Sequence, residues 1–241
     1  MDGDLHARLK ACASGIGVGI FAAPAGAIAE AVGQLGAAPV LHFDVMDGVW
    51  VPQVTGGPAF VAAFAGRYLC DVHLMVADPA AQVDGFAEAG ADIITIHAEA
   101  EGAAKALVRV RAASARLDRP ILAGLAILPG TDAEALADLF DLKPDLILVV
   151  ALDPRDGTPA DVGAAARRLA DLRARTAEFA PVMALDGGIT ETTVATAALA
   201  RPDLVVSGSA IFKAADPAAT LARLEAARRA GVLAREGADV R

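Results

Sequence analysis

Four side chains that could bind one metal ion interrupt apolar segments of the sequence. His42 and Asp44 are two residues apart and would share one face of a strand, while His73 and Asp186 lie in later segments of the same kind. Such groups are costly in apolar segments unless they are paired, hydrogen-bonded or bound to metal. Each alone could be a core histidine or a helix-capping aspartate. Together, two imidazoles and two carboxylates predict a site for one divalent ion, Zn, Fe(II), Mn or Co.

Glycines follow two of the later apolar segments and suit the binding of an anion. Gly187 and Gly188 come directly after Asp186, and Gly208 and Ser209 follow the last segment. Backbone N–H groups at such positions, ahead of a short helix, can bind a phosphate monoester, although a double glycine can also simply form a turn. We therefore expect a phosphate group to bind here.

The segments that carry these residues predict the fold. Short runs rich in Val, Ile and Leu alternate with alanine-rich helical stretches, as in a parallel sheet covered by helices. Three runs follow the same corner, in which an aspartate stands between a helix and a strand: Asp92, Asp145 and Asp203. Eight runs favour an α/β fold, a single (βα)8 TIM barrel with eight parallel strands, whose carboxyl ends would gather the polar side chains. The runs begin near Ile16, Val40, Cys70, Asp92, Pro120, Asp145, Pro181 and Asp203.

The chain is predicted to form one domain. Its 241 residues, 55% of them hydrophobic, suffice for one barrel, and no linker rich in Pro, Gly or Ser divides it. We expect a catalytic barrel at residues 15–235, with an N-terminal extension at 1–14 and a C-terminal tail at 236–241.

The charge distribution argues against nucleic-acid and membrane partners. The formal net charge is -9 and the basic residues form no stripe, so phosphate backbones and anionic lipids would be repelled. The uncharged segment at 11–29 imitates an export signal or a membrane span, but glycines and Pro24 interrupt it. Cys12 and Cys70 match no metal or redox spacing. We expect a soluble, cytoplasmic protein with free thiols and a small-molecule partner.

One motif suggests a different ligand. The segment from Gly17 to Ala22 satisfies the relaxed dinucleotide pattern G-x-G-x-x-A, and Asp44 follows at about the distance of a ribose-binding acid. No clear strand precedes the pattern, however, and Pro24 falls where the crossover helix should continue. A dinucleotide site would also leave His73 unexplained.

Five sequence blocks occur in order along the chain: HFDVMDGVWVP, DVHLMV followed by Asp78 and Pro79, FAEAGADIITIHAEA, LDGGI and SGSAIF. In this order they closely resemble the ribulose-phosphate 3-epimerase family, and the resemblance covers nearly the whole chain. It implies a ribulose-phosphate-binding barrel, a sugar phosphate as substrate and a homo-oligomer.

The resemblance also implies roles for individual residues. It makes Asp44 and Asp186 the catalytic acid and base on opposite faces of the sugar, and Met46 and Met75 part of the site lining. The implied metal ligands are His42, Asp44, His73 and Asp186. Inversion at C3 of a 2-ketose needs a proton removed from one face and returned to the other, and a cation stabilises the enediolate between these steps. No organic cofactor is required.

The positions of the lysines argue against a mechanism that uses a catalytic lysine. A Schiff-base aldolase or a lysine-centred decarboxylase needs a lysine at a strand end. The four lysines all lie elsewhere: Lys10, Lys105, Lys143 and Lys213.

The chain departs from the family pattern at substrate contacts. Gly19 stands where the family has a serine that faces the substrate, and Val150 stands where it has a methionine. The glycine-rich loop is here DPRDGTP, which retains only Pro154 and Gly157 of the pattern. Arg155 of this loop could bind phosphate in place of the lost backbone groups, or it could be a solvated loop residue.

Two polar residues near the predicted site are interpreted as structural. His97 ends the fourth run, and nothing in the sequence ties it to the other histidines. Asp47 is expected to shape the loop before Gly48 rather than to contact substrate.

Three hypotheses for function follow. The first is a metal-dependent epimerase that interconverts D-ribulose 5-phosphate and D-xylulose 5-phosphate. The second keeps this mechanism and changes the substrate to a hexulose or tetrulose phosphate, because the departures affect substrate contacts and spare the predicted metal ligands. The third is a non-catalytic sugar-phosphate-binding barrel, against which the intact pair Asp44 and Asp186 argues.

Overall fold

The computed structural model describes residues 3–36 and 40–239 and contains a closed barrel of eight strands in the order β1 to β8. All neighbouring strands are parallel, including β8 with β1, which confirms the predicted (βα)8 fold. The strands are β1 Gly15–Gly19, β2 Val40–Met46, β3 Leu69–Met75, β4 Ile93–His97, β5 Leu122–Ile127, β6 Leu146–Val150, β7 Val182–Asp186 and β8 Leu204–Ser207.

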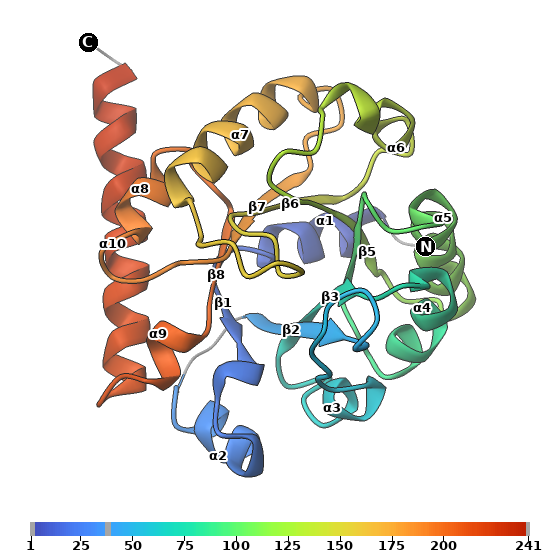
Figure 1. Cartoon of the computed structure of the whole chain (residues 1–241), viewed down its shortest axis with the longest axis horizontal. Helices are drawn as coiled ribbons and strands as arrows, with labels where there is room; N and C mark the ends of the chain where they lie inside the picture. The colour runs from blue at the N-terminus through green and yellow to red at the C-terminus, as the bar shows by residue number, and fades with distance from the viewer. Residues whose placement is uncertain (1–2, 37–39, 240–241) are drawn as a thin grey trace.

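Helices surround this barrel (Figure 1). They are α1 Gly3–Cys12, α2 Ile28–Gly33, α3 Pro58–Ala62, α4 Pro79–Glu88, α5 Ala103–Arg116, α6 Ala137–Phe140, α7 Val162–Arg175, α8 Val194–Ala198, α9 Ser209–Phe212 and α10 Pro217–Asp239. Short 3-10 turns are η1 Ile20–Ala22, η2 Ala25–Ala27 and η3 Glu134–Leu136. Among the described helices, none combines the length and the apolar character that a bilayer crossing requires.

The repeated aspartate corner joins three strands, β4, β6 and β8, each to the strand before it. Asp92 Oδ2 accepts a hydrogen bond from Cys70 N–H at 2.8 Å, at the start of the preceding strand β3. Asp145 and Asp203 accept equivalent bonds from the N–H groups of Ala123 and Met183, at 3.0 and 2.8 Å. Each corner satisfies a backbone donor at the amino end of the sheet, which explains why the same residue recurs.

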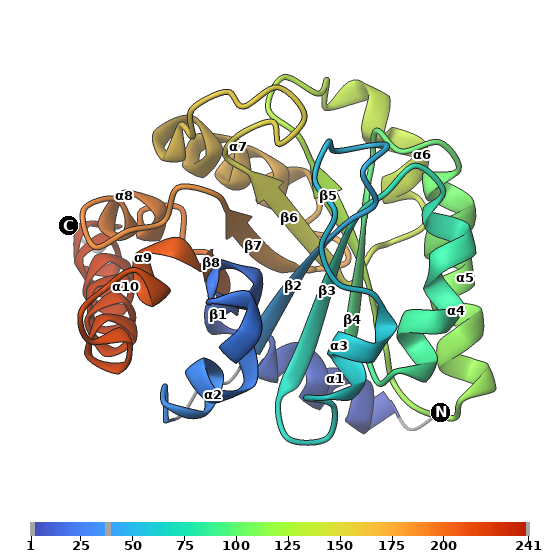
Figure 2. The ribbon, with the colours of Figure 1, turned by 60° about the horizontal axis from the view of Figure 1, so that its bottom comes forward.

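The core has two parts. The larger lies between the outer faces of the strands and the helices, and the smaller fills the barrel with side chains such as Ile93, Leu122 and Leu148. Leu9 and Ala13, at the end of α1 and just after it, pack against this inner cluster, and His6 Nε2 lies 3.0 Å from Asp145 Oδ1. Helix α1 therefore covers the amino end of the barrel (Figure 2), and the carboxyl end is left for the site.

The end of the chain differs from expectation. Helix α10 continues to Asp239, into the segment where the sequence predicts a tail. A helix that is already formed extends at little cost, because each added residue fixes its backbone for one further hydrogen bond. The rest of the predicted tail, residues 240 and 241, lies outside the described residues.

Candidate active site

The four predicted metal-binding side chains meet at the carboxyl end of the barrel. The parallel register of β2 and β3 sets Asp44 beside His73, and Asp186 is the last residue of β7. Asp44 Oδ1 lies 3.1 Å from both His42 Nε2 and His73 Nδ1, and Asp186 Oδ2 lies 3.7 and 3.8 Å from the same two nitrogens.

These separations fit a single divalent cation. One nitrogen or oxygen from each of the four residues lies within 4.8 Å of all the others. An ion bound at about 2.0 to 2.2 Å from each donor would hold neighbouring donors about 3 to 4 Å apart. The mixed nitrogen and oxygen donor set, buried on its histidine side, could therefore hold such an ion.

The two carboxylates differ in their affinity for protons. Burial and the neighbouring charge of Asp44 raise the pKa of Asp186 to about 6. Burial also acts to raise the pKa of Asp44, but His42 and His73 outweigh it and hold that pKa well below its usual range. Near neutral pH, one carboxylate is thus firmly ionised while the other is close to exchanging a proton, which is the division that a base and an acid require.

His42 is oriented by a residue that the sequence reasoning missed. Asp71 Oδ2 lies 2.7 Å from His42 Nδ1, and both side chains are buried. A carboxylate at Nδ1 accepts a hydrogen bond from that N–H group, so His42 can offer its Nε2 lone pair to a cation in the four-residue cluster. Asp71 lies two residues before His73, on the same strand face, but only the register of β2 against β3 sets it opposite His42.

The structural interpretation of His97 was wrong in one respect. His97 Nε2 lies 2.8 Å from His73 Nε2, so the residue is tied directly to a member of the cluster. On its other side, His97 Nδ1 lies 3.1 Å from Glu99 Oε2. Burial lowers the pKa of His97 to about 4, so the ring is neutral at neutral pH. The missed signal was the H-x-E spacing at the end of the fourth apolar run.

Asp47 shapes its loop, as predicted. Its Oδ1 accepts hydrogen bonds from the N–H groups of Val49 and Trp50, each at 2.9 Å, and its Oδ2 accepts one from Ala77 N–H at 2.8 Å. Gly48 has φ +77, a conformation that favours glycine. These bonds join the loops that follow β2 and β3.

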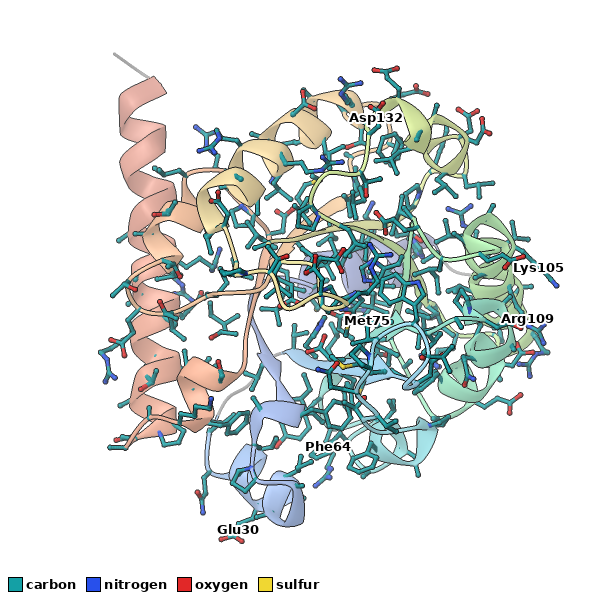
Figure 3. The ribbon with its side chains drawn as sticks, viewed as in Figure 1. Glu30, Phe64, Met75, Lys105, Arg109 and Asp132 are labelled. Carbon is teal, nitrogen blue, oxygen red and sulfur yellow. The ribbon has the colours of Figure 1, made fainter. Side chains whose placement is uncertain are left out.

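A cavity of about 600 Å³ opens beside the cluster. Asp44 and Asp186 line this cavity. Its lining also includes Thr55, Gly19 and the predicted substrate-binding residues Met46, Gly157, Gly187, Gly188, Gly208 and Ser209. All the glycines predicted to bind phosphate therefore lie on the same cavity as the two carboxylates. Met75, which is labelled in Figure 3 and ends β3, is not among the lining residues of this cavity and is 3% exposed.

Close backbone packing accounts for Gly19. A Cβ atom on Gly19 would lie 3.3 Å from Gly208 Cα, and a Cβ atom on Gly208 would lie 2.7 Å from Gly19 O. The ends of β1 and β8 therefore approach too closely for side chains to be added without a shift. Val150, the other departure, is buried inside the barrel.

Arg155 is neither free in solvent nor a lining residue of the cavity. Its Nε and Nη2 donate to the Asp153 carboxylate at 2.9 and 2.6 Å, and its Cζ lies 5.1 Å from the ring centroid of Trp50. Trp50 in turn lies on His97, with 4.5 Å between ring centroids. The guanidinium thus joins two loops by ion pairing and stacking, an arrangement that sequence reasoning did not anticipate.

Solved structures of low sequence identity share the fold. KGPDC from Streptococcus mutans aligns with a TM-score of 0.65 at 14% identity, covering 90% of this chain and 98% of that one. The 3-hexulose-6-phosphate synthase from Salmonella typhimurium aligns with a TM-score of 0.59 at 18% identity, covering 80% and 88%. At such identities, the likeness concerns the barrel alone.

Sequence relatives are more specific. A ribulose-phosphate 3-epimerase from Rhodobacter capsulatus is 37% identical over 176 residues, which is 72% of this chain and 74% of that protein. One from Mycobacterium tuberculosis is 35% identical over 217 residues, covering 88% and 91%. The model of the ribulose-phosphate 3 epimerase family matches residues 16–212. The chain therefore belongs to the ribulose-phosphate 3-epimerase family.

Proposed function

We propose that this isomerase of the ribulose-phosphate 3-epimerase type inverts C3 of D-ribulose 5-phosphate to give D-xylulose 5-phosphate, in the cytoplasm. The observation that carries the proposal is the pair Asp44 and Asp186, whose carboxylates have unequal pKa values and line one cavity beside two histidines. The names of the relatives support the substrate.

The mechanism assigns one proton transfer to each carboxylate. Asp44, ionised, takes the C3 proton from one face, and the electron pair of the broken C–H bond moves to form the enediolate. Asp186, protonated at the start, then gives its proton to C3 from the opposite face, and the C2 carbonyl forms again. Exchange with solvent returns each carboxylate to its starting state. The two residues exchange roles in the reverse reaction, and no oxidant or reductant is needed.

A divalent cation held by the cluster His42, Asp44, His73 and Asp186 would polarise the C2 carbonyl and the C3 oxygen of the sugar. Around it, the chain supplies orientation. Thr55 Oγ1 donates to Asp44 O at 2.6 Å and accepts from Met46 N–H at 2.9 Å, which fixes the end of β2.

Phosphate is proposed to bind the glycines that follow β7 and β8. Gly187 and Gly188 have φ values of +95 and +70, which turn the chain sharply after Asp186. Gly187 N–H donates to Asp186 Oδ1 at 2.6 Å, so the candidate phosphate donors are the N–H groups of Gly188 and of the Gly208–Ser209 segment, which line the same cavity as the carboxylates.

The test is turnover of a panel of ketose phosphates before and after removal of metal. The proposal predicts the highest kcat/KM for ribulose 5-phosphate, loss of turnover after exhaustive chelation, and recovery with one of Zn, Fe(II), Mn or Co. Preferential turnover of a hexulose or tetrulose phosphate would favour the alternative substrate. Tight binding without any turnover would favour a non-catalytic barrel, and full activity after chelation would refute the cation.

A further inference from the structure

We propose that Glu99 is a positioning residue, which acts through His97 to keep the Nδ1 lone pair of His73 directed at the candidate cation site. The inference rests on the proposed function, because it concerns how well the cluster binds a cation. It adds Glu99 and His97, which lie outside the four-residue cluster and are not lining residues of the cavity.

The side chains of Glu99, His97 and His73 form an unbroken line of contacts from the loop after β4 to the cluster. His73 Nδ1 lies 3.1 Å from Asp44 Oδ1, and its other nitrogen, Nε2, lies 2.8 Å from His97 Nε2. His97 Nδ1 then lies 3.1 Å from Glu99 Oε2. Both rings are buried, at 1% and 0% exposure, so water has little access to the nitrogens between them.

The carboxylate oxygen of Glu99 that faces away from His97 is fixed by two hydrogen-bond donors. Its Oε1 accepts hydrogen bonds from Leu128 N–H, at 3.0 Å, and from Thr131 Oγ1. Burial alone would raise the pKa of Glu99, but the bonds from His97, Thr131 and Leu128 lower it. The Leu128 N–H cannot rotate, so this side of the carboxylate always faces a donor.

The position of each proton follows from this anchor. An ionised Glu99 can only accept, so His97 carries its proton on Nδ1, and a neutral ring then has an acceptor at Nε2. The contact between the two rings needs one proton, which His73 Nε2 must provide. With its proton held on Nε2, His73 can offer the Nδ1 lone pair to a cation in the cluster, the form in which a histidine binds a metal.

The two histidines of the cluster are therefore oriented by different means. His42 meets the carboxylate of Asp71 directly, at 2.7 Å, whereas His73 meets the carboxylate of Glu99 through a second imidazole. Without Glu99, His97 could carry its proton on Nε2 and donate it to His73 Nε2. The hydrogen bond between the two rings would then run in the opposite direction, and the only proton of His73 would lie on Nδ1. That proton would occupy the position needed by the cation.

Trp50 and Arg155 cover the relay from the side of the loops. The ring centroid of Trp50 lies 4.5 Å from that of His97 with 39° between the planes, and the guanidinium of Arg155 lies over the outer part of this stack. Exclusion of water strengthens the hydrogen bonds beneath, because a low local dielectric favours them.

The decisive variant is Glu99→Gln, which keeps the shape of the side chain and reverses the direction of the hydrogen bonds from His73 through His97 to residue 99. The glutamine carbonyl must face Leu128 N–H, so its NH2 group faces His97 Nδ1, which must then be an acceptor. His97 would donate from Nε2 to His73, and His73 would carry its proton on Nδ1. The chain has only four histidines, so ring 15N spectra of the metal-free protein can be assigned and can report each tautomer.

We expect metal-free wild-type protein to show His97 protonated on Nδ1, and metal-free Glu99→Gln to show His97 protonated on Nε2. Zinc binding, measured by competition with a chelator, should weaken about ten-fold to a hundred-fold in Glu99→Gln. The matched control is Glu101→Gln, an exposed residue two positions along, which should leave both readouts unchanged.

A double-mutant cycle separates a relay from independent structural damage. His97→Phe keeps a ring under Trp50 and removes both hydrogen bonds, so adding Glu99→Gln to it should cause no further loss of zinc affinity. Additive losses, equal zinc affinity in Glu99→Gln and wild type, or His97 protonated on Nε2 in the wild type would each overturn the proposal. If the wild type bound no zinc, the cation of the proposed function would fail, and the tautomers of the metal-free protein would still test the relay.

Discussion

The variant Asp186→Asn should stabilise the metal-free protein, although it removes a proposed catalytic group. Asp186 is 16% exposed and lies beside Asp44, and its pKa of about 6 compares with an ordinary value of 3.8. Because the folded state holds this proton more tightly than the unfolded state, stability is fully present below about pH 4 and is lost as the pH rises through 6. A shift of about two units corresponds to about 3 kcal/mol at most.

Asparagine does not titrate, so the Asp186→Asn variant does not lose stability in this way as the pH rises. Its free energy of unfolding, relative to that of the wild type, should therefore grow by up to about 3 kcal/mol between about pH 4 and pH 7. The assay is urea unfolding of both proteins with chelator present across this pH range. Asp138→Asn, at an exposed position of α6, is the control and should show no such growth.

Added cation should reverse the order of the two proteins. A ligand that binds only the folded state stabilises it by RT ln(1 + L/Kd), where L is the free ligand concentration, so weaker binding gives less stabilisation, and the variant has lost one donor. Saturating zinc should then raise the stability of the wild type more than that of Asp186→Asn. The reasoning would be refuted by a difference between the proteins that stays flat or falls with rising pH, or by equal stabilisation with zinc.

Three further substitutions test particular contacts. Arg155→Ala should change the KM for ribulose 5-phosphate by less than about two-fold, because the side chain does not line the cavity, and should shift the emission of the only tryptophan; a rise in KM of about ten-fold or more would place the guanidinium on phosphate. Asp71→Asn should weaken zinc binding at least about ten-fold by releasing His42, and unchanged affinity would contradict the role of that carboxylate. Gly208→Ala places a Cβ atom 2.7 Å from Gly19 O, so we expect the protein to lose about 1 to 3 kcal/mol of stability, seen as a lower Tm, and to show a raised KM. A normal KM would argue against phosphate at this position.

The sequence predicted those features that depend on local pattern. Eight apolar runs predicted eight strands, and the recurring aspartates Asp92, Asp145 and Asp203 predicted a corner that the structure repeats with the same hydrogen bond. The cluster was found because imidazoles and carboxylates are conspicuous within apolar runs, and a barrel brings strand ends together.

Contacts that depend on register or on loop conformation could not be predicted. Asp71 reaches His42 only because β2 and β3 pair in one particular register, and His97 reaches His73 across the next pair of strands. The stack of Arg155 on Trp50 joins two loops that are far apart in sequence. The periodicity of the sequence does not indicate which residues of different strands or loops come into contact.

The central claim is that two carboxylates exchange the C3 proton of ribulose 5-phosphate on opposite faces, and the most direct measurement follows that proton. Metal-loaded protein is incubated with ribulose 5-phosphate in deuterated water, and deuterium at C3 is followed by NMR from the earliest conversion. The account predicts xylulose 5-phosphate that carries solvent deuterium at C3, while the remaining ribulose 5-phosphate is still unlabelled. Unlabelled product, or label that enters the remaining substrate ahead of the product, would contradict proton transfer by Asp44 and Asp186 from two faces.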